Sequence, residues 1–205
     1  MFIDDLKFSL HVVTHPLDGF WDLKYEKRGK LYMSFIFIFL WFITNIIEKG
    51  YTSFLFNAEY NLKLDLVKEL RSVLLIFLLF CIANWSVTTL MDGKGFFRDI
   101  VMVFGYASLP MSVLRLLAVI FSNAAAPSEA SYYNLIVNFA YLSFLVLLFT
   151  GIMMIHDYSF AKAVATTVVT IFSMFVLIFI LMILYTIFAQ MLQFGLMFYK
   201  ELSSR

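Results

Sequence analysis

Charged residues leave five long gaps in this sequence, and these gaps constrain the fold more than any other feature. Four gaps of 17 to 37 residues contain no charged residue, and a fifth contains Arg115 alone. About 20 helical residues cross the hydrocarbon core of a bilayer, which is about 30 Å thick. Backbone groups in lipid must bond internally, so each gap predicts a helix. We expect an all-α polytopic membrane helix bundle with five transmembrane spans, at residues 31–47, 72–91, 100–121, 135–155 and 163–189.

The composition supports a membrane protein and gives no sign of an enzyme. The chain is 62% apolar and 14% charged, whereas soluble domains are about 45–50% apolar and about 25% charged. A net charge of +1 predicts no nucleic-acid partner, and the single Cys81 excludes an intrachain disulfide. We find no metal-binding motif, nucleophile elbow or dinucleotide loop. We therefore expect no metal, no cofactor and no catalytic residue.

The last charge-free gap, residues 163–199, is too long for one crossing. Its 37 residues would reach about 55 Å as a helix. Gln190 and Gln193 interrupt its apolar character. We expect a span that ends near residue 189, followed by a helical tail over residues 190–205.

Residues 1–30 form an amphipathic N-terminal segment ahead of the membrane domain, residues 31–205. One apolar helical face is predicted by Phe2, Ile3, Leu6, Leu10 and Val13. Pro16, after Thr14 and His15, breaks this helix and opens a second. The second helix combines apolar residues with a basic end; these residues are Leu17, Phe20, Trp21 and Tyr25, then Lys24, Lys27, Arg28 and Lys30. Such a segment is typical of a helix on an anionic membrane surface. A cap packed on the spans is the alternative, and the two are compatible.

The Lys and Arg residues of the connecting segments favour a cytoplasmic N-terminus. With that orientation the inner segments contain eight basic residues and the outer segments six. Positive charge concentrates on the cytoplasmic side of membrane proteins. We expect the C-terminus outside.

Arg115 and Asn84 are the polar residues of interest inside the spans. Ionisable groups within a span indicate function by default. Arg115 either extends to the headgroups or has a partner, for which Asp92, Asp99, Asn84 and Asn138 are the candidates. Asn84 begins a polar strip that ends at Thr89, and it predicts hydrogen bonds between helices. A polar pocket is the alternative.

Two connections and the third span contain residues that break or turn helices. Gly93 and Gly95 surround Lys94 in a tight turn that lacks the spacing of a phosphate-binding loop. Gly105 and Pro110 interrupt the third span, where proline removes a backbone hydrogen bond and kinks the helix. His156 and Asp157 follow the fourth span, and we interpret them as a turn at the interface.

Three ordered motifs together resemble the Yip family of five-span membrane proteins, named for Ypt/Rab-interacting protein. The first runs from His15 through Pro16, Phe20, Trp21 and Lys24 to Gly29. The second contains Asn84-Trp85 and Asp92-Gly93-Lys94-Gly95, and the third is Gly105-Tyr106 with Pro110. The resemblance covers most of the chain, including the C-terminal tail, and is strongest to the bacterial branch.

This resemblance implies binding of other proteins. Eukaryotic members act in vesicle traffic and contact Rab GTPases, but their acidic N-terminal motif is absent here, so Rab binding is not carried over. Bacterial members are often encoded beside carbohydrate ABC importers. We expect an accessory or scaffold subunit in the bacterial cytoplasmic membrane, with the lipid bilayer and an ABC transporter complex or a homo-oligomer as partners. The alternative is a small-solute or lipid transporter or channel that uses the third span and Arg115. The expected partner- or lipid-binding residues are His15, Pro16, Phe20, Trp21, Lys24, Asn84, Trp85, Asp92, Gly93, Gly95, Gly105, Tyr106, Pro110 and Arg115.

Overall fold

The computed structural model describes residues 2–56 and 64–203 and arranges them in helices and short connections. Two short helices open the chain, α1 (Phe2–Thr14) and α2 (Pro16–Tyr25). A 3-10 turn, η1 (Pro127–Glu129), precedes the fourth long helix. The five long helices are α3 (Leu31–Tyr51), α4 (Leu66–Leu90), α5 (Phe97–Ala124), α6 (Ala130–His156) and α7 (Phe160–Ser203).

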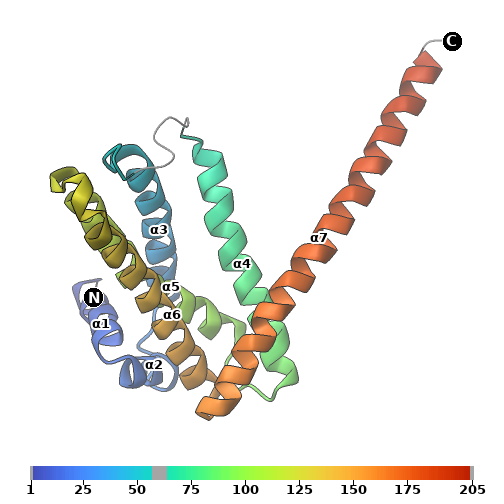
Figure 1. The fold of residues 1–205 in the computed structure, drawn as a ribbon. Helices are drawn as coiled ribbons and strands as arrows, with labels where there is room; N and C mark the ends of the chain where they lie inside the picture. Colours follow the sequence, from blue (N-terminus) through green and yellow to red (C-terminus); the bar gives the residue numbers. More distant parts are fainter. Residues whose placement is uncertain (1, 57–63, 204–205) are drawn as a thin grey trace.

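The five long helices are each long and apolar enough to cross a membrane. Successive helices run in opposite directions (Figure 1). As a result, three segments meet at one end of the bundle, which we call the α2 end. These are α2, the loop between α4 and α5, and the turn between α6 and α7. The all-α fold with five candidate spans confirms the prediction, and the chain is an integral, multi-pass membrane protein.

The helices extend beyond the charge-free gaps because charges near their ends are capped or paired. Helix α4 begins at Leu66, six residues before the predicted start at residue 72. The carboxylate of Asp65 caps it by accepting hydrogen bonds from the backbone N–H groups of Val67 and Lys68, at 3.0 and 3.1 Å. In the first turn Glu69 is buried and pairs with Lys49 of α3 at 2.9 Å.

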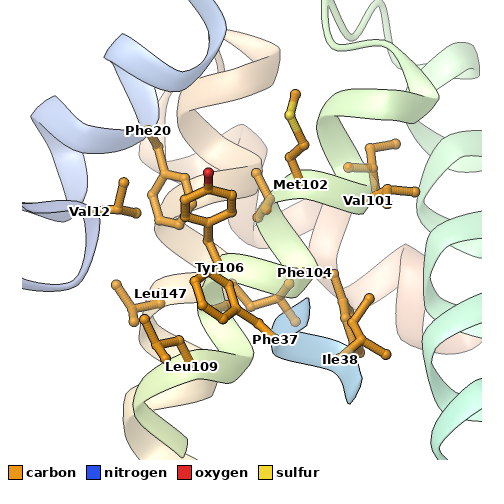
Figure 2. Packing of buried hydrophobic residues seen from close by; sticks show 14 of the residues in the cluster. Val12, Phe20, Phe37, Ile38, Val101, Met102, Phe104, Tyr106, Leu109 and Leu147 are labelled. Atoms are coloured by element: carbon orange, nitrogen blue, oxygen red, sulfur yellow. The ribbon is translucent and has the colours of Figure 1, made fainter. Parts of the chain in front are cut away.

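Helix α5 forms the centre of the bundle. In its most apolar stretch 72% of residues are buried, against 33% in α3 and in α6, which pack on either side of it. Figure 2 shows Tyr106 of α5 among buried side chains of α1, α2 and α3, including Val12, Phe20 and Phe37. The third motif therefore lies in the best-packed part of the molecule.

The N-terminal segment folds as two helices, and Pro16 opens the second as predicted. The face that packs on the bundle differs from the predicted apolar stripe. Phe8 and Val12 are buried, whereas Phe2, Ile3 and Leu10 remain exposed. Thus α1 has two apolar faces: Phe8 and Val12 turn inward, and most of the predicted stripe is left free for lipid, except Val13, which packs against the core.

Helix α7 is one continuous helix that leaves the bundle (Figure 1). It packs mainly on α4, near its own start, and only 6% of the residues in its most apolar part are buried. The predicted tail is helical to Ser203, and residues 204–205 lie outside the described residues. No helix end appears near residue 189, because glutamine is a good helix former and does not stop a helix.

Candidate functional site

A cluster of charged side chains surrounds Asp157 at the α2 end. Asp157 ends α6 with a left-handed backbone, φ 55°. Its carboxylate accepts a hydrogen bond from the Tyr25 hydroxyl at 2.6 Å and lies 3.2 Å from Lys94 Nζ and 3.8 Å from Lys24 Nζ. The cluster therefore joins α2, the α4–α5 loop and the α6–α7 turn, which are distant in sequence.

The cluster changes the acidity of its members. Partial burial disfavours the charged carboxylate, but the hydrogen bonds from Tyr25 and Lys94 and the charge of Lys24 outweigh it and hold the pKa of Asp157 below its ordinary value. The pKa of Tyr25 is raised in turn, because its hydroxyl donates to Asp157. Asp157 is therefore an anion at neutral pH and holds the two lysines.

His156 packs beside this cluster against the glycines of the second motif. It is buried, and its Nδ1 accepts a hydrogen bond from the Gly95 backbone N–H at 3.2 Å. A Cβ atom at Gly93 would lie 2.4 Å from His156 Nδ1, and one at Gly95 would lie 2.9 Å from its Cε1. Both glycines are thus required for the close approach. In the α4–α5 loop, Asp92 has a left-handed backbone with φ 54°.

The third motif joins α5 to α3 and α1. A Cβ atom at Gly105 would lie 2.5 Å from the Cα atom of Ser34 in α3, so the two backbones are in direct contact. The Tyr106 hydroxyl accepts a hydrogen bond from the Lys30 N–H at 3.1 Å, and its ring packs edge-on against Phe8 and Phe37. Pro110 lies inside α5 without ending the helix.

The first motif places both buried and exposed residues on α2. His15 precedes Pro16 and stacks on His11, with ring centroids 5.2 Å apart. Phe20 is fully buried, and a Cβ atom at Gly151 of α6 would lie 3.1 Å from its ring. Trp21, by contrast, is 46% exposed. The tryptophan is thus free for lipid or a partner, while the phenylalanine fixes α2 on α6.

A family model described as the Yip1 domain matches residues 10–185. The chain belongs to the Yip1 family. The match extends from α1 into α7 and includes all three motifs. No curated protein and no solved structure matches the chain.

In this Yip1 family protein, Asn84 connects two spans. Its side-chain amide donates a hydrogen bond to Thr170 Oγ1 of α7 at 3.3 Å, and the residue is 1% exposed. This geometry matches the interpretation of Asn84 as a contact between helices. Its neighbour Trp85 is 48% exposed and packs edge-on against Phe97 of α5.

Arg115 is buried and paired, with partners that the sequence reasoning missed. Its Nη1 donates to Asn45 Oδ1 at 2.9 Å, and its Nη2 pairs with the Glu48 carboxylate. None of the four partners expected from the sequence binds the guanidinium; these are Asp92, Asp99, Asn84 and Asn138. One feature of the sequence could have indicated these partners: Asn45 and Glu48 are three residues apart and therefore share one face at the end of α3.

Two cavities border the Yip1 motifs. A basic cavity of about 580 Å³ lies between the end of α2 and the start of α5 and is lined by Leu23, Lys24, Tyr25, Lys27, Gly29, Phe96, Arg98, Asp99 and Met102. An apolar cavity of about 550 Å³ lies between α1, α5 and α6 beside Pro110. Within residues 2–56 and 64–203, no three His, Cys, Asp or Glu side chains are grouped to hold a metal ion.

Proposed function

We propose that this Yip1 family protein is a non-enzymatic accessory or scaffold subunit that binds other membrane proteins. The observation that carries the proposal is the exposure of α7. Its apolar stretch, Phe160–Met197, contains 38 residues, and in the most apolar part of this stretch only 6% of residues are buried. An unpacked apolar helix of this length offers a large surface to a partner.

The hydrocarbon core of a bilayer does not cover the full length of this apolar stretch. Thirty-eight residues extend about 57 Å, whereas the hydrocarbon core is about 30 Å thick. Transmembrane helices tilt by up to about 40°, and at that angle the stretch still rises about 44 Å. We infer that a protein partner would cover the remaining apolar surface, toward the C-terminal half of α7.

The partner that we propose is an ABC importer for carbohydrates in the bacterial cytoplasmic membrane. Support for this partner comes from the resemblance to bacterial family members, and support for the orientation comes from the eight inner and six outer basic residues. The N-terminus and the α2 end would then face the cytoplasm, and the end of α7 would lie outside.

Purification in a mild detergent followed by mass spectrometry tests the proposal. We expect a stoichiometric membrane partner, and we expect its yield to fall when Phe188 and Phe194, which are 62% and 73% exposed, are both replaced by alanine. The matched control replaces Tyr132 and Leu135 of α6, which are both 63% exposed, by alanine and should leave the partner bound. Recovery of a homo-oligomer alone would contradict the proposal.

A lipid or solute transporter is the second candidate, and the apolar cavity beside Pro110 favours it. The expected role of Arg115 in binding a solute is less well supported, because its guanidinium is already paired with Glu48. Reconstitution into vesicles with fluorescent phospholipid in one leaflet tests it. Faster exchange between leaflets than in protein-free vesicles would favour the transporter.

A further inference from the structure

We propose that the basic cavity at the α2 end binds the phosphate headgroup of an anionic phospholipid. The cavity, about 580 Å³, lies between the turn that follows α2 and the start of α5. Its volume is in the range of small-ligand sites, about 300–1,000 Å³. This inference concerns a lipid ligand and does not depend on the protein partner proposed above.

The charge of the cavity suits an anion. Lys24, Lys27 and Arg98 line it together with one acid, Asp99. The Asp99 carboxylate accepts a hydrogen bond from the Phe96 N–H at 2.9 Å, so it is already held at the start of α5. Basic side chains near a membrane surface attract anionic lipids by about 1 kcal/mol each.

The positive charge is not cancelled by neighbouring acids. Lys24 shares the Asp157 carboxylate with Lys94, so one anion faces two cations. Lys27 and Arg98 have exposed side chains and make no ion pair within the part of the chain that the structure describes. A phosphate group would therefore meet at least two cations that are free to bind it.

The backbone at Lys27 gives a second indication. Lys27 follows the end of α2 with a left-handed backbone, φ 55°, and the Arg28 N–H reaches back to the Asp22 carbonyl at 3.4 Å. Glycine is the usual residue at this position of a helix end. A lysine here bears a conformational cost, and its side chain is presented to the cavity.

The apolar part of the lining identifies a lipid rather than a soluble anion. Leu23, Phe96 and Met102 line the cavity alongside the basic residues, which suits a headgroup attached to acyl chains. The nearby exposed aromatics, Trp21 and Tyr25, are typical of the membrane–water interface. The cavity thus combines phosphate-binding cations with an apolar wall at the interfacial end of the spans.

Native mass spectrometry of the full chain in mild detergent, titrated with phosphatidylglycerol or phosphatidylcholine, tests this proposal. We expect tighter binding of phosphatidylglycerol. Replacement of Lys27 or Arg98 by glutamine should weaken it about fivefold each, with no change in the binding of phosphatidylcholine. The matched controls, Lys68→Gln and Arg71→Gln, change exposed basic residues at the opposite end of α4 and should bind as the unaltered chain does.

Three results would overturn the assignment. Equal binding of the two lipids would show that the cavity does not recognise the anionic headgroup. An equal loss of phosphatidylglycerol binding in the Lys68 and Arg71 controls would show that binding depends on the overall surface charge and not on this cavity. Inorganic phosphate or glycerol 3-phosphate that displaces phosphatidylglycerol at equal concentration would identify a soluble anion as the ligand.

Discussion

Gly105 of α5 lies directly on the backbone of Ser34 in α3, where a Cβ atom would come within 2.5 Å of the Ser34 Cα atom. Backbone atoms cannot move aside as a flexible side chain can. The close crossing therefore fixes how far α3 approaches the central helix. Small residues at helix crossings are typical of membrane bundles.

Replacement of Gly105 by alanine should destabilise the protein by about 1–3 kcal/mol, because the added methyl group separates α3 from α5. Thermal unfolding in detergent measures the loss. Gly50→Ala is the matched control, since no atom lies within 4 Å of a Cβ there, and it should be neutral or slightly stabilising. A Gly105→Ala protein as stable as the unaltered chain would contradict the close contact.

The ion pair between Arg115 and Glu48 should show strong coupling. Both side chains are largely buried, at 8% and 21% exposure. Glu48→Leu leaves the guanidinium charge without its anion and should cost about 2–3 kcal/mol. The double variant with Arg115→Met should cost less than the sum of the single changes by about 1–3 kcal/mol.

A double-mutant cycle in mixed micelles measures this coupling. The control is the Arg28–Asp22 pair, in which the arginine side chain is 50% exposed, and its coupling should stay below about 1 kcal/mol. If the losses of stability from the Arg115 and Glu48 changes were additive, the two side chains would not be coupled and the ion pair would not contribute the expected stabilisation.

The stability of the α2 end should depend on pH through Asp157. Its pKa lies below the ordinary value of 3.8 in the folded protein. The stabilisation is therefore fully present above pH 3.8 and is lost as the pH falls through the lower, folded pKa. Compared with Asp157→Asn, the unaltered chain should melt at a higher temperature by a constant margin from pH 5 to 8.

The margin between these two proteins should shrink below about pH 3.8. Tyr25→Phe is a second check, because it removes one hydrogen bond to the carboxylate and should move the loss of stability to higher pH. A margin that grows on acidification would have the wrong sign and would exclude a stabilising role for the ionised carboxylate.

The sequence predicts the helices well and their mutual orientation poorly, and Arg115 shows why. Charge-free gaps predict which segments enter the membrane, because charged side chains within the hydrocarbon core are costly and therefore rare. The partners of Arg115 depend on how α3 and α5 rotate against each other, and Asn45 and Glu48 are 70 and 67 residues away in sequence. The hydropathy of the sequence does not predict how α3 and α5 are rotated relative to each other.

The same limit applies to the α2 end. The sequence predicts a turn around Gly93 and Gly95; the structure places the turn at Met91 and Asp92, and the two glycines lie in the connection that follows it. Their contact with His156 depends on α6 ending beside the α4–α5 loop, which follows from tertiary packing alone. Likewise most of the predicted apolar stripe of α1 remains exposed while Phe8 and Val12 are buried, because both faces of this helix are apolar enough to pack.

Replacement of Lys27 by glycine should stabilise the protein and weaken its lipid binding at once. The left-handed backbone of Lys27, φ 55°, costs a residue with a side chain about 1–2 kcal/mol, which glycine avoids. Glycine in turn loses more conformational entropy on folding, which offsets about 0.5–1 kcal/mol of this gain. We expect a net gain of about 0.5–1 kcal/mol in detergent without lipid, measured by thermal unfolding. Lys27→Gln keeps the strained backbone and should show the lipid loss without the gain. Should Lys27→Gly lower stability in lipid-free detergent, the side chain would have a structural role that the headgroup site does not explain.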